Sequence, residues 1–252
     1  MKRIVVKVGS NVLTRADGSL DVTRMSALVD QISEIYRSGI QVLLVTSGAV
    51  ACGRSILKPG ADLDSIEQRQ LYSAVGQVSL INHYSQLFRE SGITIGQVLT
   101  MKAHFEEGVE YENQRSCMEV MLANGVIPVI NENDTVCVTE LMFTDNDELS
   151  GLVAGMMGAD MLVILSNVDG LYADFGKSGE VIPEVRSGDD VSKYIGEARS
   201  SAGRGGMASK CGTAMLVSSR GIPVVIACGR RENVLADLLN SPETVPHTTF
   251  LP

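Results

Sequence analysis

The chain has 252 residues, of which 44% are hydrophobic, 20% are charged and only 4% are aromatic, and its formal net charge is −9. This length suits one large domain or two small lobes with a sizeable core. Because the charge balance is acidic, neither nucleic acid nor an anionic membrane is expected as the main partner, and an anionic substrate would need a locally basic pocket.

The cysteines and histidines show no spacing typical of a metal site. The five cysteines are scattered and odd in number, without a Cys-x-x-Cys pair, so neither a zinc site nor a disulfide framework is expected. A reducing cytoplasm is the simplest setting for them. No apolar run approaches the ~18 residues of a membrane span, and residues 1–10 lack the apolar segment of a signal peptide.

Hydrophobic periodicity and turn residues predict strands and helices that alternate along the chain. The first half is predicted to contain, in order, a strand over 4–8, a helix between Asp21 and Gly39, a strand over 40–45, a helix opening at 46–50, a helix over 65–91, a strand over 93–99, a helix over 111–124 and a strand over 126–130. The second half is predicted to contain a small β-hairpin over 136–143, a helix opening at Asp145, a strand over 161–165, helices over 189–199 and 208–220, a strand over 223–227, a helix over 232–239 and an edge strand over 248–251.

This alternation predicts a parallel-rich sheet with helices on both faces. The sequence contains no internal repeat and no low-complexity tract, and the polar segment 166–187 is too short and too mixed to be an interdomain linker. In such sheets, ligands bind at the carboxyl ends of the strands. Chemistry is therefore expected in the polar stretches that follow strands.

A glycine-rich stretch, Ser200 to Lys210, precedes one of the predicted helices. Glycines leave backbone N–H groups uncovered, and a helix start adds unpaired N–H donors and a partial positive charge. Lys210 lies about one turn into that helix and can reach back over the loop. Together these features predict an anion site suited to nucleotide phosphates, although a flexible loop before an ordinary helix has the same pattern.

The first two strands each lead into a polar turn. Lys7 lies inside the first apolar strand, so its ammonium group must reach an anion, or else extend past a sheet edge to water. Gly9 and Ser10 follow it and offer backbone N–H groups to a phosphate. After the second strand, the turn from Thr46 to Ala49 presents a hydroxyl and backbone donors suited to a carboxylate; Ser47 also suits the N-cap of the next helix.

Two clusters of acidic and amide residues follow the fourth predicted strand, at 131–134 and 144–147. Asn can bind a substrate carboxylate, and Asp can bind an ammonium group, a metal or a lysine. Turns and helix N-caps favour the same residue types, but two such clusters in succession after a buried strand favour a functional site.

The turn 166–172 follows another strand and suits the rim of a nucleotide pocket, although Asp-Gly turns are common. Other nucleotide folds fit poorly. The sequence has no GxxxxGK[ST] loop, no GxGxxG after the first strand and no HRD or DFG motif, and it also lacks the GxSxG elbow of a hydrolase.

Taken together, these stretches resemble the amino acid kinase family, over almost the whole chain. The matching motifs are KVGS at 7–10, TSGA at 46–49, NENDTV at 131–136, TDND at 144–147, NVDGLY at 167–172 and GRGGMASK at 203–210. NENDxV paired with a DND motif is specific for the branch of the family that phosphorylates glutamate, whereas KxGS alone is not.

The resemblance implies a three-layer α/β/α sandwich with a central, mostly parallel sheet. Residues 1–252 would form a single domain, with the substrate side in about 1–160 and the nucleotide side in about 161–252. The implied reaction transfers a phosphoryl group from ATP to the side-chain carboxylate of L-glutamate, the first step of L-proline biosynthesis. Mg²⁺ would be held mainly by the ATP phosphates, with no direct protein ligand.

The resemblance also assigns roles to individual residues. Lys7 and Lys210 would act on the phosphoryl group from opposite sides, and Asp147 would hold the two lysines in place. Asp145 would support glutamate or metal binding, and Asp134 would take the substrate ammonium. The implied substrate-binding residues are Ser47, Gly48, Ala49, Asn131, Asp134, Asp145 and Asn146. The implied nucleotide-binding residues are Lys7, Gly9, Ser10, Ser166, Asn167, Arg204, Gly205, Gly206, Met207, Ala208, Ser209 and Lys210.

Two stretches of the sequence depart from the family pattern. Arg204 stands where Thr is usual, and Ser166-Asn167 stands where Thr-Asp is common. The C-terminal PUA domain of many members is not expected in these residues. L-proline is a candidate inhibitor, a homo-dimer or homo-tetramer is expected, and the next pathway enzyme, glutamate-5-semialdehyde dehydrogenase, is a candidate partner.

Two alternatives stay open. The chain could belong to another branch of the family, acting on aspartate, N-acetylglutamate, carbamate or UMP, although those branches usually carry a different substrate loop in place of NENDxV. It could also be a non-catalytic module that senses an amino acid, against which the retention of both lysines and Asp147 argues.

Overall fold

The structure, a computed structural model, describes residues 1–252 apart from 59–61, 138–142, 144, 175–178, 187 and 196–205. Most of the predicted hairpin over 136–143 and two predicted nucleotide-site residues, Arg204 and Gly205, therefore lie outside the described residues.

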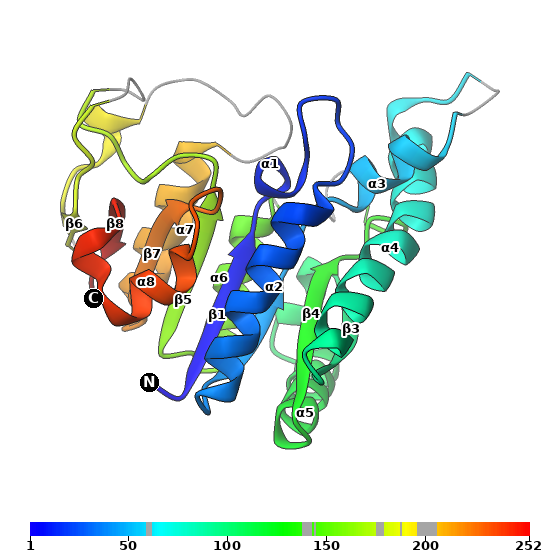
Figure 1. The fold of residues 1–252 in the computed structure, drawn as a ribbon, viewed down its shortest axis with the longest axis horizontal. Helices are drawn as coiled ribbons and strands as arrows, with labels where there is room; N and C mark the ends of the chain where they lie inside the picture. Colours follow the sequence, from blue (N-terminus) through cyan, green and yellow to red (C-terminus); the bar gives the residue numbers. More distant parts are fainter. Residues whose placement is uncertain (59–61, 138–142, 144, 175–178, 187, 196–205) are drawn as a thin grey trace.

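One sheet runs through the described part of the chain. Its strands are β1 (Arg3–Val8), β2 (Gln41–Val45), β3 (Thr94–Thr100), β4 (Val126–Glu132), β5 (Met161–Ser166), β6 (Glu184–Val185), β7 (Val224–Cys228) and β8 (His247–Phe250). Their order is β3-β4-β2-β1-β5-β7-β8-β6 (Figure 1). Neighbours from β3 to β7 pair in parallel, and β8 runs antiparallel to β7. The prediction of a mostly parallel sheet is confirmed.

The helices connect these strands, as the alternating pattern predicted. They are α1 (Ser10–Leu13), α2 (Val22–Arg37), α3 (Ala49–Ile56), α4 (Ser65–Glu90), α5 (Val109–Ala123), α6 (Asn146–Met156), α7 (Met207–Ser218) and α8 (Val234–Asn240), with short 3₁₀ turns η1 (Lys102–Phe105), η3 (Ser192–Tyr194) and η4 (Pro242–Thr244). In the described ranges, no helix is both long enough and apolar enough to cross a membrane.

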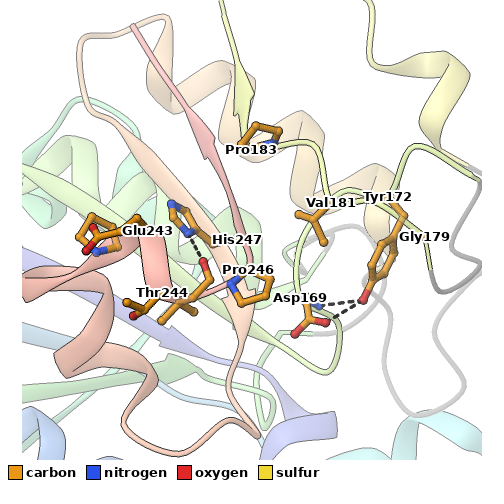
Figure 2. Close-up of a pocket in the computed structure, with 11 residues that line it drawn as sticks. Asp169, Tyr172, Gly179, Val181, Pro183, Glu243, Thr244, Pro246 and His247 are labelled. Carbon is orange, nitrogen blue, oxygen red and sulfur yellow. Dashed lines mark hydrogen bonds between the residues drawn. The ribbon is translucent and has the colours of Figure 1, made fainter.

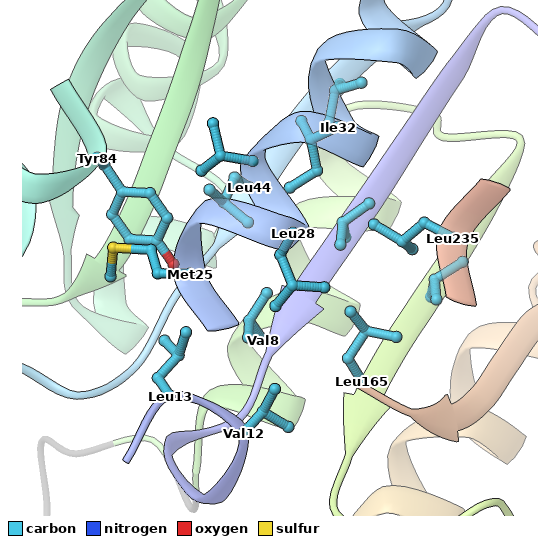
Figure 3. Close-up of a cluster of buried hydrophobic side chains, with 14 of the residues drawn as sticks. Val8, Val12, Leu13, Met25, Leu28, Ile32, Leu44, Tyr84, Leu165 and Leu235 are labelled. Carbon is cyan, nitrogen blue, oxygen red and sulfur yellow. The ribbon is translucent and has the colours of Figure 1, made fainter. Parts of the chain in front are cut away.

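The helices cover both faces of the sheet, which gives the three layers that were expected. Alternate residues of β1 point to opposite faces, since the side-chain period of a strand is two. Val8 and its same-face neighbours pack against α2, α4 and α8, as the cluster around Leu28 shows (Figure 3). Val5 lies in the second core, against α5, α6 and α7. Lys7 shares the strand parity of Val5 and therefore faces α6 and α7.

Two sequence-based predictions of secondary structure are wrong. Of the helix predicted over 189–199, the described part contains only the turn Ser192–Tyr194. Asp189 and Asp190 accept hydrogen bonds from the backbone N–H groups of Arg186 and Ser192, and such local bonds compete with a helix. The last strand is not at the sheet edge, because β6 pairs with its far side. The strand β6 has two residues, too few for a periodic signal.

The helices α3 and α4 cross with their backbones in direct contact. A Cβ added to Gly76 would lie 1.8 Å from the carbonyl oxygen of Ala49, and one added to Gly53 would lie 1.9 Å from that of Tyr72. Only glycine allows backbones to approach this closely. Since α3 begins directly after the Ser47-Gly48 turn, the crossing fixes that turn relative to α4.

Replacing Gly76 with alanine is therefore expected to lower the free energy of unfolding by about 2–3 kcal/mol or more, because backbone atoms must move apart. Gly155→Ala is the matched control: Gly155 is exposed in α6 with nothing within 4 Å of an added Cβ, so it should gain about 0.5–1 kcal/mol. Urea unfolding of both variants measures the difference. Equal stabilities would contradict the contact between α3 and α4.

Candidate active site

The predicted site residues gather at one edge of the sheet. Lys7, Asn131 and Ser166 lie at or near the carboxyl ends of β1, β4 and β5, and Ser47 follows β2. Because these strands are parallel, their carboxyl ends meet at the same edge. The N-termini of α6 and α7 open beside them, which brings in Asp145, Asn146 and Asp147 from one helix and residues 206–210 from the other.

A buried carboxylate joins the two predicted lysines. Oδ1 of Asp147 lies 2.5 Å from Nζ of Lys7, and Oδ2 lies 3.0 Å from Nζ of Lys210. The side chain of Asp147 is 1% exposed, while those of Lys7 and Lys210 are 6% and 11% exposed. Three charged groups from β1, α6 and α7 thus form one cluster with a formal charge of about +1.

The two lysines keep the carboxyl group of Asp147 ionised. Burial of Asp147 opposes its ionisation, but the ammonium groups of Lys7 and Lys210 outweigh that effect and hold the pKa of the carboxyl below its ordinary value. Asp147 is therefore ionised at neutral pH and neutralises one of the two lysine charges. The remaining positive charge lies at the carboxyl edge of the sheet, where an anionic ligand is expected.

Asp145 holds the start of α6 and links it to α7. Its Oδ1 accepts hydrogen bonds from the backbone N–H groups of Asp147 and Glu148, at 2.9 and 3.0 Å, as an N-cap does. Its Oδ2 accepts a hydrogen bond from Oγ of Ser209. Burial and the nearby charge of Asp147 raise the pKa of Asp145. The cap fixes the first turn of α6, and with it the position of Asp147.

Asn146 connects three parts of the site through one amide nitrogen. Its Nδ2 has three oxygen atoms within hydrogen-bond distance for its two hydrogens: the carbonyl oxygen of Thr46 at 2.6 Å, Oγ of Ser47 at 2.9 Å and Oδ1 of Asn131 at 2.9 Å. Gly48 follows with φ of +105°, a conformation that favours glycine, and it leads into α3 at the buried Ala49. The turn after β2, the loop after β4 and the start of α6 are thus held together.

The variant Asn146→Asp is expected to destabilise the chain by about 2–3 kcal/mol at neutral pH, because an ionised carboxylate has no donor for the carbonyl oxygens of Thr46 and Asn131. Asn113→Asp, on the exposed face of α5, is the matched control and should stay within about 0.5 kcal/mol of the parent. Thermal unfolding of the two variants in parallel is the measurement. A drop shared by both would reflect added charge rather than the lost amide.

Two residues of α4 that the sequence did not single out, Arg69 and Gln77, support the loop after β4. Arg69 of α4 donates to Oδ1 of Asp134 through Nε at 2.9 Å and also through Nη2, which reaches Oε2 of Glu132 at 3.1 Å. Gln77 of α4 accepts a hydrogen bond from Nδ2 of Asn131 at 2.9 Å. No local sequence signal marked either residue, because polar side chains on a long helix are ordinarily solvated.

The predicted nucleotide-binding residues are only partly brought together. Gly206 caps α7, Met207 to Lys210 form its first turn, and Ser10 begins α1. The backbone N–H of Gly9 is not available to a phosphate as predicted, since it donates to the carbonyl oxygen of Leu165 at 3.1 Å and continues the pairing of β1 with β5. A Cβ there would lie 3.2 Å from the same carbonyl oxygen of Leu165, so the backbone allows little room for a side chain.

The Ser166-Asn167 pair lies at the carboxyl end of β5, with Ser166 buried and Asn167 exposed. The turn that follows borders a pocket of about 510 Å³ (Figure 2). Asp169 and Tyr172 line one side of it, hydrogen-bonded to each other at 3.2 Å, and His247 with Thr244 lines another. Asp169 also accepts a hydrogen bond from Nε of Arg231 at 2.7 Å.

Within the ranges that the structure describes, no three His, Cys, Asp or Glu residues gather closely enough to hold a metal ion. Oxygen atoms that a cation prefers are nevertheless present at the cluster, on Asp145 and Asp147.

A parallel sheet with two lysines bridged by a buried aspartate at its carboxyl edge, beside two helix N-termini, is built to hold anionic groups together. The sequence matches the amino acid kinase family over residues 2–228, and the chain belongs to that family.

Named relatives narrow the comparison. The chain is 58% identical over 252 residues to the glutamate 5-kinase of Bacteroides thetaiotaomicron, covering 99% of this chain and 70% of that protein. It is 46% identical to the glutamate 5-kinase of Chlorobaculum tepidum, over 93% of this chain and 65% of the relative. With the glutamate 5-kinase of Symbiobacterium thermophilum it shares 42% identity, over 96% of this chain and 94% of the relative.

Proposed function

We propose that the chain is an ATP-dependent kinase that phosphorylates the side-chain carboxylate of L-glutamate, giving L-glutamyl 5-phosphate and ADP, the first step of L-proline biosynthesis. The names of its similar relatives support the substrate. The observation that carries the chemistry is the cluster in which Asp147 holds Lys7 and Lys210.

This reaction needs electrostatics more than acid–base chemistry. The accepting carboxylate is already ionised at neutral pH, so no general base is required. One of its oxygens forms a bond to the γ-phosphorus while the bond from that phosphorus to the β–γ bridging oxygen breaks, and ADP leaves. The obstacle is that two anions must meet, which Lys7 and Lys210 offset by binding the phosphoryl oxygens.

Asp147 acts as a positioning residue in this proposal. It contacts both ammonium groups, and it would keep each in a fixed place before substrates arrive. The backbone N–H groups at the start of α7 and the side chains of Ser166 and Asn167 would contact the nucleotide. Arg204 and Gly205 keep the same proposed role, outside the described residues.

Magnesium fits this site as a companion of ATP. The carboxylate oxygens of Asp145 are hard ligands of the kind it prefers, and the ion is proposed to be held mainly by the ATP phosphates. When bound, Mg²⁺ would neutralise phosphate charge. Asp145 would orient whatever group, substrate or ion, approaches the start of α6.

The glutamate site is proposed at the turn after β2 and the loop after β4. Asn146 is hydrogen-bonded there to Ser47 and Asn131. Gly48 and Ala49 would continue the same wall, and Asp134 would take the substrate ammonium. Inhibition by L-proline, a cytoplasmic location, a homo-oligomer and contact with glutamate-5-semialdehyde dehydrogenase complete the proposal. The exposed apolar side chains of Val78, Val109 and Val120 on α4 and α5 support a subunit contact.

ADP release, coupled to an optical assay, tests the proposal across L-glutamate, L-aspartate, N-acetyl-L-glutamate, carbamate and UMP. Turnover is expected with L-glutamate and Mg²⁺-ATP, far above a control without acid. The proposal is wrong if glutamate gives no more ADP than that control. Turnover with another acceptor instead would assign the chain to a different branch of the family, and binding without turnover would leave an amino-acid sensor.

A further inference from the structure

The ion pair between Arg69 and Asp134 leaves part of each group unused. A guanidinium carries five N–H donors. The contacts of Arg69 use only Nε and Nη2, and both of these bind Oδ1 of Asp134, with Nη2 also reaching Glu132. Among the described residues, neither Nη1 of Arg69 nor Oδ2 of Asp134 has a hydrogen-bond partner.

The side chains that carry the two unused groups are both partly exposed. The side chain of Arg69 is 23% exposed and that of Asp134 is 11% exposed, whereas the side chain of Glu132 is buried at 2%. The pair therefore presents a cationic donor and an anionic acceptor side by side, at a partly open surface. Charge-assisted bonds of this kind are stronger than neutral ones.

The pair is also tied to the reaction centre by a short chain of contacts. Asp134 follows β4 by two residues, and Asn131 near the end of β4 accepts a hydrogen bond from Asn146. Asn146 is the neighbour in sequence of Asp147, which holds the two lysines. Gln70, next to Arg69, donates to the carbonyl oxygen of Thr135 at 2.7 Å and anchors the same loop.

We infer that Arg69 is a specificity-determining residue that binds the α-carboxylate of the substrate, while Asp134 beside it takes the α-ammonium. This inference rests on the proposed function. An α-amino acid carries both charges on one carbon, and the Arg69–Asp134 pair offers the complementary charges on adjacent atoms. With the head group held there, only the side-chain carboxylate is left to reach Lys7 and Lys210.

A substrate analogue separates this role from a purely structural one. 4-Aminobutanoate is L-glutamate without its α-carboxylate, and it keeps the amine and the accepting carboxylate at the same spacing. If Arg69 binds the α-carboxylate, its removal harms only glutamate. If Arg69 merely holds Asp134, its removal harms both substrates equally, because both need Asp134.

The experiment measures kcat/KM for L-glutamate and for 4-aminobutanoate in the parent chain and in Arg69→Met, Arg69→Lys and Arg89→Met. The parent should prefer glutamate by about 100-fold or more, as expected for a lost charge-assisted pair. Arg69→Met should lose most of this preference, because its kcat/KM for glutamate falls while its kcat/KM for 4-aminobutanoate stays the same. Arg69→Lys keeps the positive charge but lacks the planar guanidinium that can bind a carboxylate through two parallel donors, so it should retain part of the preference. Arg89, exposed near the end of α4, serves as the control and should change nothing.

The possible failures are distinguishable. If the parent does not turn over glutamate at all, the proposed function is wrong before any variant is made. A preference of the parent below about 3-fold, or an equal loss of both activities in Arg69→Met, overturns the role of Arg69 while the kinase assignment stands. If Arg69→Met does not fold, the role of Arg69 is tested by the ratio of kcat/KM for glutamate to kcat/KM for 4-aminobutanoate in the parent and in Arg69→Lys.

Discussion

Replacing Lys210 with methionine is expected to lower kcat by about 10²–10³-fold, the usual cost of removing one group that stabilises charge in the transition state. The fold should survive, because Asp147 keeps its contact of 2.5 Å with Lys7 and is not left as an isolated buried charge. Methionine retains most of the aliphatic length of lysine, so packing around the first turn of α7 changes little.

Steady-state kinetics with glutamate and Mg²⁺-ATP, together with a thermal unfolding curve, would separate catalysis from stability. Lys7→Met is predicted to behave in the same way, since Lys210 remains bound to Asp147 at 3.0 Å. Lys2→Met is the control, because Lys2 is exposed beside the amino end of β1, at the opposite edge of the sheet. An unchanged kcat in Lys210→Met would refute the role proposed for that ammonium group.

Asp147→Asn should be among the most destabilising substitutions in the chain, at about 3–5 kcal/mol, since it leaves two largely buried ammonium groups without a counter-charge. For a chain of this size, that loss corresponds to a fall in Tm of roughly 10 °C. Asp30→Asn, on the exposed side of α2, is the matched control and should shift Tm very little. A stable Asp147→Asn would mean that solvent reaches the lysines.

The parent and Asp147→Asn also differ in how their unfolding free energies depend on pH. The folded-state pKa of Asp147 is lowered, so its contribution to stability is present above the unfolded pKa of about 3.9 and is lost as the pH falls through the folded pKa. The difference in unfolding free energy between the parent and Asp147→Asn should therefore stay constant from pH 8 to 5 and narrow below about pH 4. A difference that narrowed between pH 8 and 6 instead would implicate another group.

Much of the fold follows from local pattern, and the residues show why. The strand β1 could be predicted because its aliphatic run is bounded by Gly9, and α2 because Asp21 accepts a hydrogen bond from the N–H of Arg24 as an N-cap should. Hydrophobic periodicity did not predict which side chains of a helix are buried. In α4, which matches the helix predicted over 65–91, apolar Val78 is 62% exposed while polar Ser73 is buried.

The site was predictable in part for the same reason. Lys7, Asp147 and Lys210 each stood out locally, but only the folded arrangement of β1, α6 and α7 brings both ammonium groups to within 3.0 Å of the Asp147 carboxylate. Arg69 could not be found in this way, because an arginine on a helix is ordinarily a solvated residue. Its significance depends on a loop 65 residues further along the chain. Likewise, the N–H of Gly9 looked free until its bond to Leu165 was seen.

The backbone contact between α3 and α4 has a mechanical consequence. Side-chain contacts can slip by changing rotamers, but the approach of Gly76 to Ala49 contains no side chain that could adjust. Any tilt of α4 must therefore shift the Ser47-Gly48 turn through α3, and at the same time pull on residues 131–135 through Arg69, Gln70 and Gln77. A movement of α4 would therefore displace both walls of the proposed glutamate site together, the turn after β2 through α3 and the loop after β4 through the three hydrogen-bonded side chains.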